Sequence, residues 1–126
     1  ADFSAGALPG YDDFPAGKRL AGTVTGAKGR TYRGRIVFDL DESETWELLN
    51  GERDGIEYLI PFSKIASIVP RGWDRSAVRL RDGSEIELEG GTDVGSDNAG
   101  VLVYSDSGGR PDYVAWDDVE RIEFEP

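Results

Sequence analysis

The fold is decided by two stretches, Ile60-Pro-Phe62-Ser-Lys-Ile65-Ala-Ser-Ile68 and Val114-Ala-Trp116-Asp-Asp-Val119-Glu-Arg-Ile122, which follow one pattern at an offset of 54 residues. In both, an apolar strand holding one aromatic residue leads into a short polar turn and a closing apolar strand. The match extends beyond these two stretches, and residues 24–70 align with residues 78–124 without a gap. Internal repeats indicate how a fold is divided. We therefore expect two small β modules rather than one large domain.

Five aligned positions are identical, and the rest agree in character and order. Each aligned half begins with a basic hairpin turned at a glycine, continues through an aspartate, an acidic loop and a second glycine, and ends in the strand–turn–strand quoted above. The identical pairs are Val24/Val78, Gly29/Gly83, Asp39/Asp93, Gly55/Gly109 and Ile68/Ile122. The alternative is a single irregular β domain whose halves are similar by coincidence.

The repeat divides the 126 residues into four segments. We expect an irregular N-terminal arm over residues 1–17, a first module over 18–70, a linker over 71–76 and a second module over 77–126. A module of about 50 residues buries too little surface to be more than marginally stable alone. We therefore expect the two modules to pack together.

The composition excludes several classes of chemistry. The chain has no Cys and no His, so it cannot form a disulfide, a thiolate nucleophile, a Cys/His zinc site or a Ser-His-Asp triad. Its 25 acidic and 14 basic residues give a net charge of −11, which opposes binding to nucleic acid and to anionic membranes. No apolar run is long enough to span a bilayer. We expect a protein partner, no nucleic acid and no membrane insertion.

The charge alternates along the chain. It sums to +3 over residues 1–35, −6 over 36–70, +3 over 71–81 and −11 over 82–126. Each repeat therefore opens basic and turns acidic. The pattern favours charge pairing between adjacent strands, worth about a few tenths of a kcal/mol per pair. The alternative is a polar surface suited to head-to-tail contacts.

Short runs of alternating apolar and polar residues predict strands along the whole chain. The Asp82-Gly83 turn predicts a tight hairpin, because apolar residues alternate on both sides of it. The segment 43–49 predicts one or two helical turns with Ser43 as N-cap. The expected strands cover residues 20–25, 31–40, 56–62, 66–69, 78–80, 86–88, 101–104, 112–116 and 121–124.

Five short strands with a one-turn connector before the last resemble the SH3-like and Sm-like barrels. Residues 78–90 resemble the opening meander of such barrels, and residues 114–122 resemble their closing strand–turn–strand. The resemblance implies an all-β fold of two tandem five-stranded barrels. Many Sm-like proteins bind RNA through loop Asp and basic residues, but the acidic loops of this chain depart from that pattern. The chain also resembles uncharacterised bacterial exported proteins with paired small β-barrels.

Acidic loops at the same place in each repeat are candidate calcium sites, because calcium takes six to eight oxygen ligands, often from one flexible loop. The candidate ligands are Asp39, Asp41, Glu44, Asp93, Asp97 and Asn98. The first loop begins like an EF-hand but has Glu44 in place of the glycine and Asn50 in place of the final glutamate. The alternative is that Asp39 and Asp93 form Asx turns where the second strand of each repeat ends.

The three tryptophans, Trp46, Trp73 and Trp116, together with Tyr104 and Tyr113, are a candidate stacking surface for a carbohydrate or a peptide. Trp116 matches Phe62 across the repeats, so its alternative role is to fill the core. A glycosidase would need two carboxylates on either side of a cleft, and two small barrels offer little cleft.

These signals together predict a non-catalytic protein-interaction or structural module that uses edge strands as its contact. The first alternative is a calcium-modulated binding module that uses loops 39–44 and 93–98, and the second is a carbohydrate-active protein. No other cofactor is expected. The chain begins at Ala1 without an initiator Met, and we expect an exported protein, periplasmic or secreted, that serves in the bacterial cell envelope.

Overall fold

The computed structural model describes residues 19–40, 43–45, 47–72, 74–90, 93–105 and 108–126. The expected all-β class is confirmed, since the described elements are ten strands and three 3₁₀ turns. The strands are β1 (Ala21–Gly26), β2 (Thr31–Phe38), β3 (Leu48–Arg53), β4 (Ile56–Pro61), β5 (Ile65–Arg71), β6 (Arg75–Leu80), β7 (Glu85–Glu89), β8 (Val101–Tyr104), β9 (Asp112–Val114) and β10 (Val119–Phe124). The 3₁₀ turns are η2 (Ala27–Gly29), η3 (Phe62–Lys64) and η4 (Trp116–Asp118).

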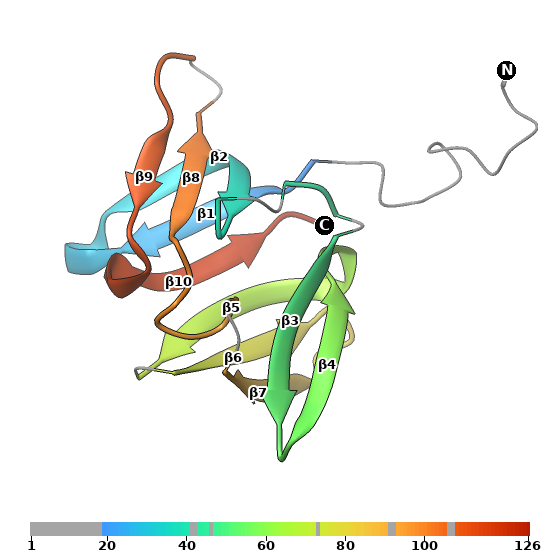
Figure 1. Cartoon of the computed structure of the whole chain (residues 1–126). Helices are drawn as coiled ribbons and strands as arrows, with labels where there is room; N and C mark the ends of the chain where they lie inside the picture. Colours follow the sequence, from blue (N-terminus) through green and yellow to red (C-terminus); the bar gives the residue numbers. More distant parts are fainter. Residues whose placement is uncertain (1–18, 41–42, 46, 73, 91–92, 106–107) are drawn as a thin grey trace, which may run out of the picture.

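All ten strands belong to one antiparallel sheet in the order β4-β3-β7-β6-β5-β10-β1-β2-β8-β9. The hydrogen-bonded order has two ends, β4 and β9, and does not close on itself. The sheet bends so that β3 to β7 gather in one half of the molecule and β1, β2, β8, β9 and β10 in the other (Figure 1). Among the residues described, none belongs to an apolar helix of bilayer-spanning length.

The sheet is symmetric about its two central strands. Strands β5 and β10 are equivalent in the repeat and pair with each other, with Ile68 opposite Ile122. On the two sides, Val78 lies opposite Ile68 and Val24 lies opposite Ile122. Outward from β5 come β6, β7, β3 and β4, and outward from β10 come their equivalents β1, β2, β8 and β9. Each half therefore combines the first hairpin of one repeat with the last three strands of the other.

The repeat alignment needs one adjustment, at β3 and β8. Arg35 on β2 lies opposite Tyr104 on β8, whereas its equivalent Glu89 on β7 lies opposite Glu52 on β3. Tyr104 aligns with Asn50 in the gapless comparison, so the pairing of β3 has shifted by two residues relative to that of β8. The structurally equivalent residues on these two strands are therefore 52, not 54, positions apart.

The five identical positions of the repeat all lie where the fold constrains them. The two valines and two isoleucines form the buried central pairs just described. Gly29 and Gly83 lie in the turns after β1 and β6 with φ of 75° and 92°, a left-handed conformation that glycine adopts without steric cost. Gly55 and Gly109 lie in the connections between β3 and β4 and between β8 and β9.

The described residues form one hydrophobic core, which lies on the inner face of the sheet and draws on both halves. Its aromatic centre is Phe38, whose ring centroid lies 5.3 Å from that of Phe62 and 5.7 Å from that of Trp116. Phe62 also meets Phe124 edge-on, at 5.7 Å between centroids. The repeat-equivalent residues of η3 and η4 thus meet around one phenylalanine, which ties the two halves together.

The prediction of helical turns over residues 43–49 is wrong. The backbone N–H groups of Ser43 and Glu44 donate to the Glu47 carboxylate over 2.8 Å and 3.0 Å, and β3 begins at Leu48. The segment makes one turn held by that carboxylate, because Leu48 and Leu49 gain ladder partners on β4 instead. Strand β3 was not expected, since its sequence Leu-Leu-Asn-Gly-Glu-Arg carries turn signals in its middle.

Candidate functional site

The aspartate of each predicted calcium loop contacts backbone of the other repeat. Asp39, which follows β2, accepts a hydrogen bond on Oδ1 from the backbone N–H of Ala99 over 2.6 Å. Asp93, which is 5% exposed, accepts on Oδ2 from the backbone N–H of Asn50 over 2.7 Å. Each aspartate follows the second strand of its own repeat. Each therefore links that strand to the region where the third strand of the other repeat begins. This role explains why an aspartate stands at the same place in both repeats.

Asn98 and Asp97 lie in the second of these loops and differ in environment. Asn98 is buried, donates from Nδ2 to the carbonyl oxygen of Asp93 over 2.7 Å and accepts on Oδ1 from the N–H of Gly100 over 2.7 Å. Asp97 is exposed. The hydrogen bonds of Asn98 hold the loop in shape just before β8.

The first loop is described in part. The backbone of Glu44 forms an isolated antiparallel β-bridge with that of Arg19. Asp41 lies outside the described residues. Within the described ranges, no group of three or more acidic, His or Cys side chains is placed to hold a metal ion. The calcium site stays a prediction, without a described ligand cluster to support it.

Of the three tryptophans, the structure describes Trp116. Its side chain is 6% exposed and its ring meets Phe38 edge-on, with an interplanar angle of 87°. This placement matches the alternative role in the core. Trp46 and Trp73 lie outside the described residues.

Three surface grooves of about 420, 440 and 390 Å³ lie among the described residues. Each is lined by one acidic side chain among the described residues: Glu125, Asp118 and Glu44 respectively. A glycosidase mechanism needs two carboxylates facing one sugar. None of these three grooves brings two together.

The pKa of the Asp82 carboxyl is held below its ordinary value. The Ser84 hydroxyl donates to Asp82 Oδ1 over 2.6 Å, and the Ser84 backbone N–H donates to the same oxygen over 2.9 Å. Both bonds favour the ionised carboxylate. Because this group lies in the fully exposed β6–β7 turn, the shift reflects turn geometry rather than a catalytic cleft.

Exposed apolar side chains concentrate on the β3–β4 hairpin, at one end of the sheet. Leu48, Ile56 and Leu59 are 44%, 59% and 54% exposed. Strand β4 has β3 as its hydrogen-bonded neighbour on one side and is the edge of the described sheet on the other. This surface could not be predicted from the sequence, because the segment Ile56–Pro61 is apolar except for Glu57, and such a run is typical of a buried strand.

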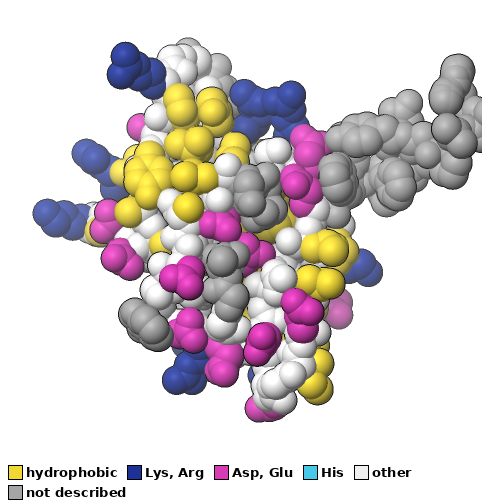
Figure 2. All heavy atoms as spheres, viewed as in Figure 1, with side chains coloured by type: hydrophobic (Ala, Val, Ile, Leu, Met, Phe, Trp, Pro, Cys, Tyr) yellow, Lys and Arg dark blue, Asp and Glu magenta, His cyan; other side chains and the backbone are white. Residues whose placement is uncertain are grey.

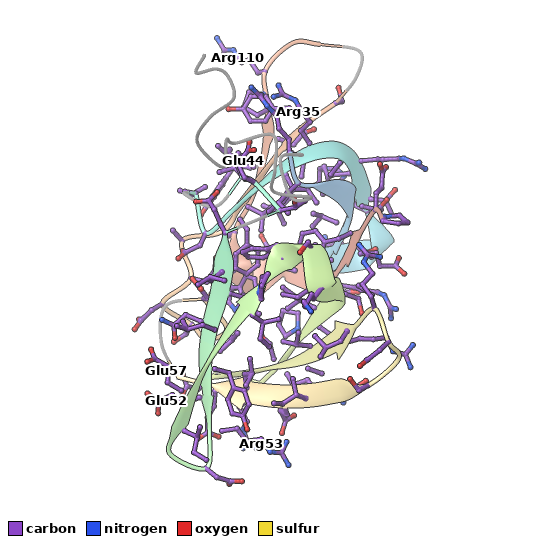
Figure 3. All side chains as sticks on the ribbon, turned by 90° about the vertical axis from the view of Figure 1, so that its right-hand side faces the viewer. Arg35, Glu44, Glu52, Arg53, Glu57 and Arg110 are labelled. Carbon is purple, nitrogen blue, oxygen red and sulfur yellow. The ribbon has the colours of Figure 1, made fainter. Side chains whose placement is uncertain are left out.

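The same hairpin carries acidic side chains on its outer face. Glu57 on β4 lies opposite Glu52 on β3, and Glu52 lies opposite Glu89 on β7. Leu59, which lies opposite Asn50, shares this face by strand alternation. We call the outward residues Leu48, Glu52, Glu57, Leu59 and Glu89 the acidic face. Glu52 and Glu57 lie together at one end of the molecule, beside Arg53 (Figure 3).

The opposite end of the sheet presents apolar and basic side chains. Leu102 on β8 lies between Val37 on β2 and Tyr113 on β9, and Tyr113 is 56% exposed. Hydrophobic side chains gather over β8 and β9, with Lys and Arg side chains at the margin (Figure 2). We call the outward residues Arg35, Leu102, Tyr104 and Tyr113, with Arg110 of the adjoining turn, the basic face. Arg35 and Arg110 lie at the end of the molecule away from Glu52 and Glu57 (Figure 3).

Neither a protein-family model nor a curated protein matches this chain. The function is therefore argued from the two faces at the ends of the sheet.

Proposed function

We propose that this protein is a non-catalytic protein-interaction module that receives an extended segment of a partner at the edge of β4. One observation carries the proposal: the β3–β4 hairpin at the end of the sheet exposes Leu48, Ile56 and Leu59. An edge strand offers unpaired backbone N–H and C=O groups, and its alternate side chains give specificity to strand addition.

The chemistry of β4 supports this proposal. Edge strands of soluble proteins are usually protected by charges, prolines or covering loops. Strand β4 has one charged residue, Glu57, and ends at Pro61. Its residues 56–59 can therefore accept a partner strand. Burial of Ile56 and Leu59 would add about 25 cal/mol for each Å² of apolar surface covered.

We further propose that each half of the sheet is an SH3-like or Sm-like barrel built across the repeats. In repeat terms, the strand order of each half is last, first, second, third, fourth, so each half has the five short strands of such a barrel. The one-turn 3₁₀ segments η3 and η4 stand directly before the last strand in both halves. The rigid core would then hold β4 in place for binding.

The test is selection of strand-forming peptides from a displayed random library on the immobilised whole protein. Selected peptides are expected to perturb backbone amide NMR signals of β3 and β4. Leu59→Lys is expected to weaken their binding at least about tenfold, which corresponds to about 1.4 kcal/mol. The matched control is Thr23→Lys, an equal charge change on β1 in the sheet interior. Peptides that perturb only signals outside β3 and β4, or a Leu59→Lys variant with full affinity, would contradict the proposal.

A further inference from the structure

The groove of about 440 Å³ beside β9 is built from segments of both repeats. It is lined by η2, η4, β9 and the start of β2, in the half of the molecule that does not contain β4 (Figure 1). Its lining includes two tyrosine rings, two cations and one carboxylate: Tyr32, Tyr113, Lys28, Arg30 and Asp118. Concave surfaces where a few polar groups converge beside aromatic ones are typical of small-molecule sites.

The same backbone frame recurs in the other half of the molecule. The N–H of Gly26 donates to the carbonyl oxygen of Arg30 over 2.6 Å, and the N–H of its equivalent Leu80 donates to that of Ser84 over 2.8 Å. Strands β1 and β6 also pair with β10 and β5 with an irregularity in register at the same place. The fold therefore does not require the side chains by which the two halves differ here.

A glycine opens the groove in one half. Leu80 packs partly buried against the core, whereas Gly26 has no side chain, and a Cβ there would lie 3.4 Å from Cε1 of Tyr32. The backbone of Gly26 is extended, with φ of −103° and ψ of −173°, a conformation that any residue adopts. The path of the chain therefore does not need this glycine, and its effect is to leave space beside the ring of Tyr32.

The groove carries cations where the other half carries an internal hydrogen bond. Lys28 and Arg30 correspond to Asp82 and Ser84, whose side chains bond to each other over 2.6 Å. Lys28 and Arg30 are exposed and take part in no ion pair within the described ranges. On this side of the molecule, Lys and Arg side chains project beside hydrophobic ones (Figure 2). In a chain of net charge −11, these two cations favour an anionic ligand.

The two tyrosines add flat apolar surfaces that are held in place. The Tyr113 hydroxyl donates to the carbonyl oxygen of Ala99 over 2.7 Å, and Tyr113 is 56% exposed. Tyr32 packs against the core, where its equivalent Ile86 shows that an aliphatic side chain is sufficient. A pyranose ring presents C–H groups on its face, which pack on an aromatic ring, and hydroxyls at its rim, which donate to a carboxylate such as Asp118.

We propose that this groove binds an acidic saccharide, a sugar that carries a carboxylate or a sulfate. The tyrosine rings pack on the face of the sugar, Lys28 and Arg30 bind its anionic group, and Asp118 accepts its hydroxyls. An acidic peptide is less suited to the groove, because its carboxylates would be repelled by Asp118 and it brings no ring of hydroxyls. This activity goes beyond strand addition at β4 and does not depend on it, since β4 lies in the other half.

The test is NMR titration of the full chain with three oligosaccharides of equal length: an oligomer of a hexuronic acid, a sulfated oligomer and the neutral hexose oligomer. We expect an acidic oligomer to shift the backbone amide signals of η2, η4 and β9. It is expected to bind at least about tenfold more tightly than the neutral oligomer, and less tightly at high salt. The tighter of the two acidic oligomers identifies the recognised group as carboxylate or sulfate.

The variants exchange groove residues for those of the other half. K28D/R30S replaces the cations and G26L fills the groove with the equivalent leucine, and each is expected to weaken binding at least about tenfold. K28R/R30K keeps the charges and is expected to bind within about threefold of the unaltered chain. The matched control K64D/R71S makes the same residue changes in the other half and is expected to bind like the unaltered chain. Circular dichroism verifies that each variant is folded.

Four outcomes would overturn the proposal. These are no binding of either acidic oligomer in the millimolar range, equal binding of the neutral oligomer, full affinity in K28D/R30S, and tighter binding of an oligoglutamate peptide, which would assign the groove to an acidic peptide instead. Leu59→Lys, which tests the edge of β4, is expected to leave saccharide binding unchanged. Failure of one proposal is therefore distinguishable from failure of the other.

Discussion

At the scale of single residues, Asp93 and Asp39 show how a side chain can join two repeats. Each carboxylate accepts a backbone N–H of the other repeat, from Asn50 and Ala99 respectively. In the sequence the two aspartates suggest either turns or calcium ligands, and the residue type alone does not separate these roles. The position of the donor decides, and the donor lies 43 residues before Asp93 and 60 residues after Asp39.

We expect Asp93→Ala to lower the free energy of unfolding by about 1–3 kcal/mol, because the N–H of Asn50 would lose its acceptor inside the protein. Asp93→Asn keeps an acceptor oxygen and is expected to lose less. Asp97→Ala alters an exposed loop residue and is expected to change stability by no more than about 0.5 kcal/mol. Urea unfolding of the three variants checks these values.

Melting the unaltered chain and Asp93→Ala with and without calcium tests the alternative role of Asp93 as a metal ligand. If calcium raised the melting temperature of the unaltered chain and Asp93→Ala removed that rise, the carboxylate would be a metal ligand. A melting temperature that does not respond to calcium or to a chelator would agree with the hydrogen-bonding role.

At the scale of elements, hydrophobic alternation and turn chemistry predict most strands. The Asp82-Gly83 hairpin stands between β6 and β7 as expected, and η3 and η4 stand where short turns were expected. Strand β3 could not be predicted, because Asn50 and Gly51 look like turn residues. In the structure Gly51 is buried, and a Cβ there would lie 2.8 Å from Cβ of Leu88. The glycine therefore serves close packing of β3 against β7, which sequence pattern alone does not reveal.

The pairing of β1 with β10 requires a glycine at position 22. A Cβ added to Gly22 would collide with the carbonyl oxygen of Glu123 and lie 2.9 Å from Cα of Phe124. We expect Gly22→Ala to destabilise the fold by about 1–3 kcal/mol or more, since backbone atoms must move. Thr23→Ala, on the neighbouring residue, is expected to cost less than about 1 kcal/mol. Equal unfolding free energies for the two variants in urea would contradict this account of the β1–β10 contact.

At the scale of the whole molecule, the neighbours of each strand decide what can fold alone. Strand β5 pairs with β6 and β10, and β10 pairs with β1 and β5. A cut between residues 72 and 73 would therefore leave β5 and β10 without any of their neighbours. We expect each fragment to be largely unfolded alone and an equimolar mixture to recover the β-sheet circular dichroism of the intact chain. Two fragments that fold separately would instead favour one barrel for each repeat.

The exchange between repeats could not be predicted from the sequence for a simple reason. Alternation fixes which face of a strand is buried, but both repeats offer similar apolar faces, so either partner satisfies the pattern. The acidic face and the basic face at the ends of the sheet could not be predicted from the sequence either. The sequence shows alternating charge, but only the strand order reveals that Glu52, Glu57 and Glu89 form one row at one end while Arg35 and Arg110 lie at the other.

The symmetry about Ile68 and Ile122 has a consequence for ancestry. A homodimer of one repeat whose subunits exchanged their first hairpins would have this strand order. The last strand of one subunit would then end beside the first strand of the other. In the present chain the end of β5 and the start of β6 are joined by the short connection between Arg71 and Arg75, which lie opposite each other. The equivalent ends of β10 and β1 meet where the N–H of Glu125 donates to the carbonyl oxygen of Ala21 over 2.8 Å. Tandem fusion of the gene for such a dimer would yield this molecule with no rearrangement of its core.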